Sequence, residues 1–118
     1  MATIDVAKGL VELCKTGDFN GAMEKYYGED IVSVEPMGES AIAEGLDAVR
    51  AKAKGFFEYM DVHSCEVFGP YVNGDQFAVR FLLDATNKGS GERMMMDEVG
   101  VYTVKEDKVV HEVFMYGG

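Results

Sequence analysis

The sequence predicts an α+β fold in which a curved antiparallel meander sheet wraps on three N-terminal helices and forms a cone with an internal pocket. Helical periodicity dominates the chain before about residue 60, whereas the part after it shows alternating strand patterns joined by short turns. Helices that precede most of the strands are typical of the α+β class. The length of 118 residues suits one domain, residues 1–118, with a core of its own.

Two helices are predicted at the N-terminus. The first spans residues 4–15, because apolar residues recur on one helical stripe: Val6, Ala7, Leu10, Val11 and Cys14. Thr3 is its predicted N-cap, and Gly17 ends it at a position that tolerates a left-handed backbone. The second helix follows, with Asp18 as its predicted N-cap and Gly28 as its end.

A longer amphipathic helix is predicted over residues 46–60. Its apolar face carries Leu46, Val49, Ala53, Phe56, Phe57 and Met60. The charged residues, among them Lys52, fall largely on the opposite face. A helix with this pattern packs against a flat apolar surface, which in this chain is the sheet.

The strands are predicted from alternation and from turn residues. A short strand over residues 30–35 and a loop over residues 37–43 precede the long helix, and four further strands span residues 63–71, 76–86, 93–104 and 109–116. Asn73-Gly74 and Glu106-Asp107 are the predicted turns between the later strands, which therefore form an antiparallel meander. The curvature of the cone is expected at Gly69-Pro70 and at Gly100.

The short strand ends at Glu35, the first candidate for a catalytic residue. Pro36 follows it, and because proline cannot donate to a sheet ladder, it ends the strand and keeps Glu35 extended. Apolar strand neighbours such as Val34 favour a low-dielectric surrounding, which disfavours the charged carboxylate and suits a general base. The alternative is a carboxylate that faces water at a strand end, as most carboxylates do.

Charge and composition limit the classes of binding partner that we expect. The formal net charge is −10, and such a chain repels phosphate groups, so nucleic acids and anionic membranes are not expected as partners. No apolar run approaches the ~20 residues of a membrane span, and the N-terminus lacks a signal-peptide pattern. We therefore expect a cytoplasmic protein whose two cysteines, Cys14 and Cys65, are reduced.

Metal and cofactor motifs are not found in the sequence. His63 and His111 are isolated and give no metal-binding spacing. A phosphate-binding glycine loop and a G-x-S-x-G sequence are also missing. The expectation is that neither a metal nor a cofactor takes part.

A family pattern is carried by residues 6–13, 16–19, 23–27, 34–38 and 44–49. Together these segments resemble the SnoaL-like and ketosteroid isomerase-like superfamily, which has the cone fold of nuclear transport factors. The step Val34-Glu35-Pro36-Met37-Gly38 is the more specific part of the resemblance. Over the second half of the chain, the resemblance rests on strand order, on the turn over residues 105–110 and on the aromatic C-terminus.

The resemblance implies a pocket at the mouth of the cone, a small apolar molecule as its ligand, and a homodimer. In steroid isomerases of this superfamily, the acid before the proline is the general base. This role maps onto Glu35, with glutamate in place of the usual aspartate. The same comparison places Tyr27 and Tyr116 beside the pocket.

Two departures argue against a true steroid isomerase. That enzyme holds the developing oxyanion with two acidic hydrogen-bond donors. The donor tyrosine aligns with Leu10 and the donor carboxylic acid aligns near Gly100, and neither residue has a side-chain donor. A base without such donors lacks what is usually the largest contribution to this kind of catalysis.

Further pocket candidates come from strand faces that carry acids and aromatic rings, and from the long helix: Glu98, Tyr102, Glu112, Phe114 and Phe57. Arg80 lies mid-strand between apolar residues, where its charge needs a partner. It belongs either to an acid–base network in the pocket or to an ion pair on the outer face of the sheet. His63 is expected at the surface, and the Met94-Met95-Met96 run is expected to alternate between the two faces.

Three functions are compatible with this pattern. The first is an enzyme for proton transfer, cyclisation or hydration of a small apolar carbonyl compound, with Glu35 as the base. The second is a non-catalytic module of the same fold that binds an apolar ligand, which the missing donors at Leu10 and Gly100 favour. The third is a dimeric interaction domain that uses the outer face of the sheet.

Overall fold

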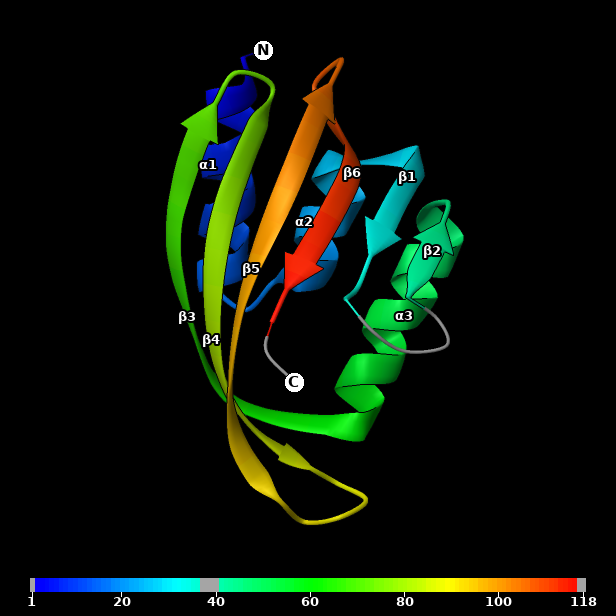
Figure 1. The fold of residues 1–118 in the computed structure, drawn as a ribbon, viewed down its shortest axis with the longest axis vertical. Helices are drawn as coiled ribbons and strands as arrows, with labels where there is room; N and C mark the ends of the chain where they lie inside the picture. The colour runs from blue at the N-terminus through cyan, green and yellow to red at the C-terminus, as the bar shows by residue number, and fades with distance from the viewer. Residues whose placement is uncertain (1, 37–40, 117–118) are drawn as a thin grey trace.

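The computed structural model describes residues 2–36 and 41–116 and confirms the α+β class (Figure 1). The helices are α1 (Thr3–Lys15), α2 (Phe19–Tyr26) and α3 (Leu46–Tyr59). The strands are β1 (Tyr27–Val34), β2 (Ile42–Glu44), β3 (Met60–Asn73), β4 (Gln76–Asn87), β5 (Arg93–Lys105) and β6 (Lys108–Met115). Within the described part, no helix has the length and apolarity that crossing a bilayer requires.

The strands form one six-stranded sheet in the order β2-β1-β6-β5-β4-β3. The predicted antiparallel meander is confirmed for β3 to β6. The whole sheet is mixed, because β1 pairs with β6 in parallel. The short strand β2 falls mostly in the segment predicted as a loop. Alternation along a strand shows which faces differ, but it carries no information on the direction of a partner that is distant in sequence.

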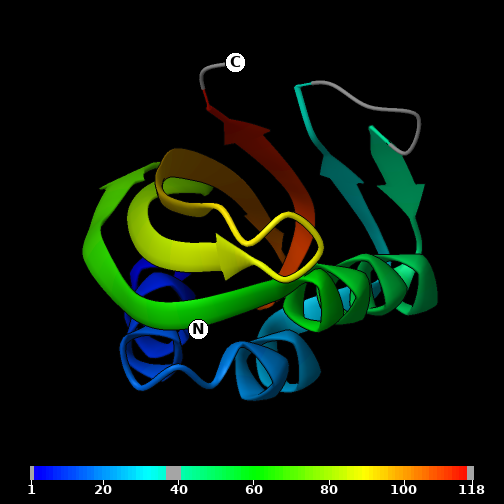
Figure 2. The ribbon, with the colours of Figure 1, turned by 90° about the horizontal axis from the view of Figure 1, so that it is seen from below.

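The sheet curls around α1 and α2, as Figure 2 shows. The predicted bend at Gly69-Pro70 is confirmed, because the register between β3 and β4 shifts between Phe68 and Tyr71. No β-bulge lies at Gly100, since Gly100 pairs in unbroken register with both neighbouring strands. A Cβ at Gly100 would lie 2.9 Å from Cε2 of Tyr102 and 3.0 Å from Cε1 of Phe114. Glycine therefore makes room for two aromatic rings.

The boundary between α2 and β1 differs from the prediction. Asp18 caps α2 as expected, because its Oδ1 accepts a hydrogen bond of 2.8 Å from the backbone N–H of Gly21. The helix ends at Tyr26 instead of Gly28, and Tyr27 already has an extended backbone and pairs with Val109. Because β1 begins at Tyr27, the side chain of this residue is placed by the sheet.

The core lies between α1 and the inner face of the sheet. The predicted apolar stripe of α1 is confirmed: Val6, Ala7, Leu10, Val11 and Cys14 are all buried. On β4 the inward residues are Phe77, Val79, Phe81, Leu83 and Ala85. The stripe and these strand residues belong to the same apolar cluster, which fixes the closed end of the cone.

Candidate functional site

A cavity of about 430 Å³ lies between the inner face of the sheet and the three helices. Most of its wall is apolar and includes Leu10, Met23, Phe56, Phe81, Met96 and Phe114. Its polar side chains are Tyr27, Glu35, Lys52, Glu98, Tyr102, Glu112 and Tyr116. An apolar cavity of this size with a few converging polar groups has the character of a small-molecule site.

Nine of the ten site residues predicted from the sequence line this cavity: Leu10, Tyr27, Glu35, Phe57, Glu98, Tyr102, Glu112, Phe114 and Tyr116. Most of them come from α1, β1, α3, β5 and β6. Glu35 directly follows β1, and Tyr116 directly follows β6. The inward parity of β5 and β6 is therefore the one that carries acids and aromatic rings. Their roles stay predictions.

Arg80 is the exception, and its assignment to the pocket is wrong. Its Nε and Nη2 atoms donate to the two carboxylate oxygens of Asp97 at 2.9 and 2.8 Å, in an exposed ion pair. Even-numbered residues of β4 point away from the core, so Arg80 lies on the outer face. This is the outer ion pair that the sequence left open as an alternative.

His63 is also exposed, as predicted, and Met95 and Met96 lie on opposite faces.

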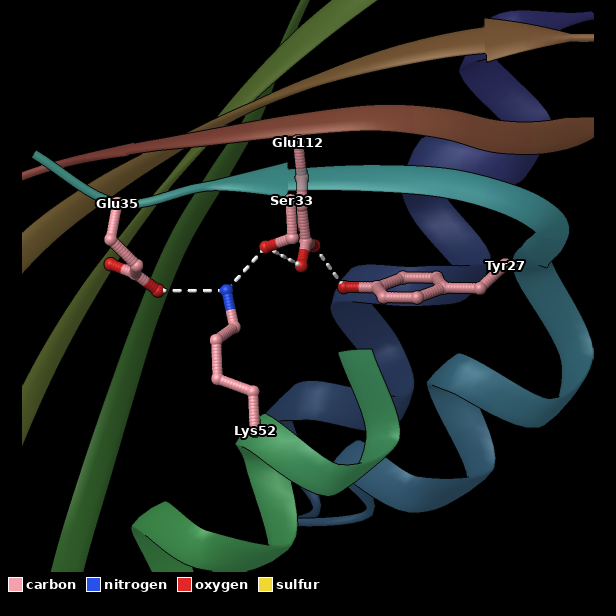
Figure 3. A network of polar contacts seen from close by, with 5 residues as sticks. All are labelled: Tyr27, Ser33, Glu35, Lys52 and Glu112. Atoms are coloured by element: carbon pink, nitrogen blue, oxygen red, sulfur yellow. Dashed lines mark hydrogen bonds and ion pairs between the residues drawn. The ribbon is translucent and has the colours of Figure 1, made fainter. Parts of the chain in front are cut away.

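Glu35 lies just beyond the end of β1, where its backbone N–H donates to the carbonyl of Ala41 at 2.7 Å. Its side chain is 21% exposed and lines the cavity, so Glu35 is not a freely solvated strand end. Oε1 of Glu35 accepts a hydrogen bond of 3.0 Å from Nζ of Lys52 (Figure 3). The surroundings of Glu35 therefore differ from the expected apolar ones, because an ammonium group lies beside its carboxylate.

Lys52 is a site residue that the sequence reasoning missed. The helical pattern assigned it to the polar face of α3, yet its side chain is only 24% exposed and points into the cavity. Its Nζ also donates to Oγ of Ser33 and lies 5.4 Å from the ring centroid of Phe114. Spacing could have found it, because Lys52 is three residues after Val49 and four before Phe56, both of which line the cavity.

Glu112 is the most deeply buried acid of the site, with 2% of its surface exposed. It accepts hydrogen bonds from the hydroxyl of Tyr27 and from Oγ of Ser33, the latter at 2.8 Å. A continuous polar chain therefore runs from Glu35 through Lys52, Ser33 and Glu112 to Tyr27 (Figure 3). Burial raises the pKa of Glu112, and the two hydroxyl donors oppose that shift.

Ser33 is the second residue that the sequence reasoning did not assign to the site. It is fully buried, and its hydroxyl connects Lys52 to Glu112. Alternation could have identified Ser33, because it lies two residues before Glu35 and so points to the same side of the chain.

Glu98 differs from the other two acids of the cavity because it has no partner. Within residues 2–36 and 41–116, no hydrogen bond or ion pair involves its carboxyl group. Burial, and next the charge of Glu35, raise the pKa of Glu98 to about 7. Burial followed by the same charge also raises the pKa of Tyr116 to about 12.

The raised pKa of Glu98 predicts a pH-dependent loss of stability. Its ordinary pKa is 4.5, so the folded state holds this proton more tightly than the unfolded state does. The stabilisation from protonation is complete below about pH 4.5 and is lost as the pH rises through 7. We expect Glu98→Gln to raise the free energy of unfolding at pH 8 by about 1–3 kcal/mol, and to change it little at pH 4.

Urea denaturation at the two pH values measures this difference. Glu66→Gln is the matched control, because it removes the same charge from an exposed position on β3. An equal effect of Glu98→Gln at pH 4 and pH 8 would contradict the assigned surroundings of Glu98.

In the part of the chain that the structure describes, no group of three or more His, Cys, Asp or Glu side chains is placed to hold a metal ion. The polar side chains of the cavity offer carboxyl, ammonium and hydroxyl groups.

Comparison with protein families gives a match over almost the whole chain. A family model described as a SnoaL-like domain matches residues 1–116. The chain belongs to the SnoaL-like family. This assignment agrees with the observed cone and with the superfamily that the sequence resembles. No functionally curated protein matches the chain.

Solved structures include a close relative of this SnoaL-like chain. A candidate SnoaL-like polyketide cyclase from Mesorhizobium loti, also described as a carbohydrate phosphatase, is 50% identical, with a TM-score of 0.96. The alignment covers 98% of this chain and 100% of that chain.

More distant structures share the fold alone. A protein with a cystatin-like fold from Xanthomonas campestris is 18% identical, with a TM-score of 0.80, over 100% of this chain and 92% of that chain. A candidate SnoaL-like polyketide cyclase from Jannaschia is 15% identical, with a TM-score of 0.76, over 94% of this chain and 85% of that chain.

Proposed function

We propose that this SnoaL-like protein is an enzyme that moves a proton next to a carbonyl group of a small apolar compound, with Glu35 as the general base. The observation that carries the proposal is the position of Glu35 on the wall of an apolar cavity, where its Oε1 accepts a hydrogen bond of 3.0 Å from Nζ of Lys52. An ionised carboxylate within reach of a bound ligand is the group that proton abstraction needs. The description of the Mesorhizobium protein as a candidate cyclase is consistent with carbonyl chemistry.

The reaction begins when the Glu35 carboxylate takes a proton from the carbon beside the carbonyl. The electrons of the broken C–H bond move into a new carbon–carbon double bond, and the carbonyl electrons move to the oxygen, which becomes an enolate. Return of the proton to another atom gives an isomer, and attack of the enolate carbon on a second carbonyl closes a ring. Both outcomes need a group that stabilises the negative oxygen.

Lys52 is our candidate for stabilising that oxygen. The hydroxyl protons of Tyr27 and Ser33 are donated to Glu112, and Leu10 and Gly100 carry no donor. The Nζ of Lys52 has three hydrogens, of which two are used by Ser33 and Glu35. As Glu35 becomes neutral, the charge of Lys52 is released toward the enolate that forms at the same moment.

The test is hydrogen–deuterium exchange of ketones in D₂O, followed by NMR with and without protein. Small cyclic and aryl ketones such as 2-tetralone serve as probes, because exchange beside the carbonyl reports the first step for any final product. The proposal predicts exchange above the buffer rate for at least one ketone that binds. Ketones that bind and shift the protein's resonances without faster exchange would favour the binding module instead.

A homodimer is a further part of this proposal. The outer face of the sheet exposes Phe68, Met95 and Met115, which supports an association between copies through that face.

A further inference from the structure

The cavity contains more acidic than basic side chains, and not every acid has a partner. One ammonium, Lys52, faces three carboxyl groups among the described residues. Lys52 is engaged by Glu35 and Ser33, and Glu112 is engaged by Tyr27 and Ser33. Glu98 alone has no partner in that part of the chain.

The surroundings of Glu98 oppose its ionisation from several sides. Burial raises its pKa most, Glu35 beyond β1 and Glu112 on β6 raise it further, and Lys52 on α3 opposes the shift without bonding to Glu98. The other titratable groups that face it are Cys65 on β3, Tyr102 on β5 and Tyr116 beyond β6. A half-buried carboxylate that lacks a partner, as Glu98 does, destabilises the fold and calls for an explanation.

We propose that the ligand of this cavity carries a positively charged amine, which binds to Glu98 while the apolar body of the ligand packs against the aromatic wall. This inference rests on the proposed function, because it takes the cavity as the ligand site. An ammonium group would make a charge-assisted hydrogen bond to Glu98 and remove the cost of its burial. Where one sign of charge dominates a low-dielectric cleft, the field attracts the opposite sign.

The aromatic wall fits the same ligand. Phe114 already lies 5.4 Å from the ammonium of Lys52, and its ring meets that of Tyr102 edge-on at 6.2 Å between centroids. Aromatic faces attract cations, so these rings tolerate an ammonium better than a carboxylate. An anionic ligand would meet Glu35 and Glu98, and Lys52 already neutralises Glu35.

Three ligands of one shape and different charge test the proposal. They are 2-aminotetralin, which is cationic at neutral pH, uncharged 2-tetralol, and tetralin-2-carboxylate. We expect the amine to bind about 10- to 100-fold more tightly than the alcohol, and the carboxylate to bind most weakly. At pH 7, calorimetry in buffers of different ionisation enthalpy should show that the amine releases a proton, because its charge lowers the pKa of Glu98.

Two variants test whether the amine preference depends on Glu98. Glu98→Gln keeps the size of the side chain and should abolish both the preference for the amine and the proton release. Glu66→Gln removes an equal charge from the exposed surface of β3 and should leave both unchanged, which controls for the net charge of −10. Circular dichroism verifies that both variants are folded.

The outcomes that overturn the proposal are distinct from failure of the proposed enzyme. The proposal is overturned if the alcohol or the carboxylate binds as tightly as the amine, if none of the three binds, or if both variants lose the preference equally. The proposal is also overturned if binding of the alcohol is accompanied by proton uptake, because protonated Glu98 would then be the form that binds the ligand. These are binding measurements without turnover, so loss of ketone exchange would contradict the enzyme and leave the amine preference standing.

Discussion

Glu35→Gln is expected to lower the rate of ketone exchange by about 10²- to 10⁴-fold, the contribution of a positioned general base. The glutamine side chain has the same length, and its carbonyl oxygen can still accept the hydrogen bond from Nζ of Lys52. It cannot take a proton from carbon at neutral pH. The variant therefore removes the chemistry while it preserves the position and the main contact of the side chain.

The exchange assay compares this variant with the wild-type protein and with Glu66→Gln, whose carboxylate is exposed and outside the cavity. Binding of the ketone, followed by shifts of protein resonances, should persist in Glu35→Gln. A rate within twofold or so of wild type would show that Glu35 is not the base, because the expected loss is far larger.

Glu112→Leu is expected to cause the largest loss of stability among single changes in the site. The leucine would leave the hydroxyls of Tyr27 and Ser33 without their acceptor in a buried position. It would also remove the carboxylate whose charge lies beside Lys52. Each buried hydroxyl that loses its acceptor costs about 1–3 kcal/mol, so the free energy of unfolding should fall by a few kcal/mol.

Urea denaturation at pH 7 measures this loss. Glu112→Gln keeps an acceptor oxygen for one hydroxyl and should cost less than Glu112→Leu. Glu66→Leu, at an exposed strand position, should stay within about 0.5 kcal/mol of wild type. If Glu112→Leu were as stable as wild type, the polar chain would not contribute to the stability of the fold.

The position of Glu35 could be predicted because it depends on local chemistry. Pro36 ends the strand whatever the rest of the chain does, and the alternation before it sets the face on which Glu35 lies. Alternation also put Glu98, Tyr102 and Glu112 on strand faces rich in acids and rings, but it did not determine which face of each strand points inward. That Glu98 lacks a partner depends on which side chains of other elements reach it, and local patterns do not contain that information.

Lys52 was misassigned for a physical reason. A lysine has a long apolar stem, so it can occupy an apolar stripe of a helix while its ammonium reaches a polar group beyond it. Helical periodicity that counts lysine as polar places it on the wrong face. Lys52 donates to two acceptors, Ser33 on β1 and Glu35 just after it. These acceptors come near α3 only through tertiary packing.

Arg80 and the parallel pairing of β1 show the limits of alternation. The outward residues of β4 include both Arg80 and Leu82, so the pattern of that strand does not separate an inner from an outer face by polarity. The partner that decides the matter, Asp97, lies on another strand. In the same way, β1 pairs with the last strand of the chain, and only the closed fold sets their relative direction.

The most direct test of the account is the stereochemistry of exchange at the carbon beside the carbonyl. A base fixed on one wall of the cavity reaches one face of a bound ketone, so the wild-type protein should exchange one of the two hydrogens on that carbon much faster than the other. NMR in D₂O distinguishes the singly and doubly deuterated ketones and follows each hydrogen separately. Fast exchange of one hydrogen, lost in Glu35→Gln, is the predicted result; equal exchange of both hydrogens, unaffected by that change, would contradict a catalytic role for the cavity.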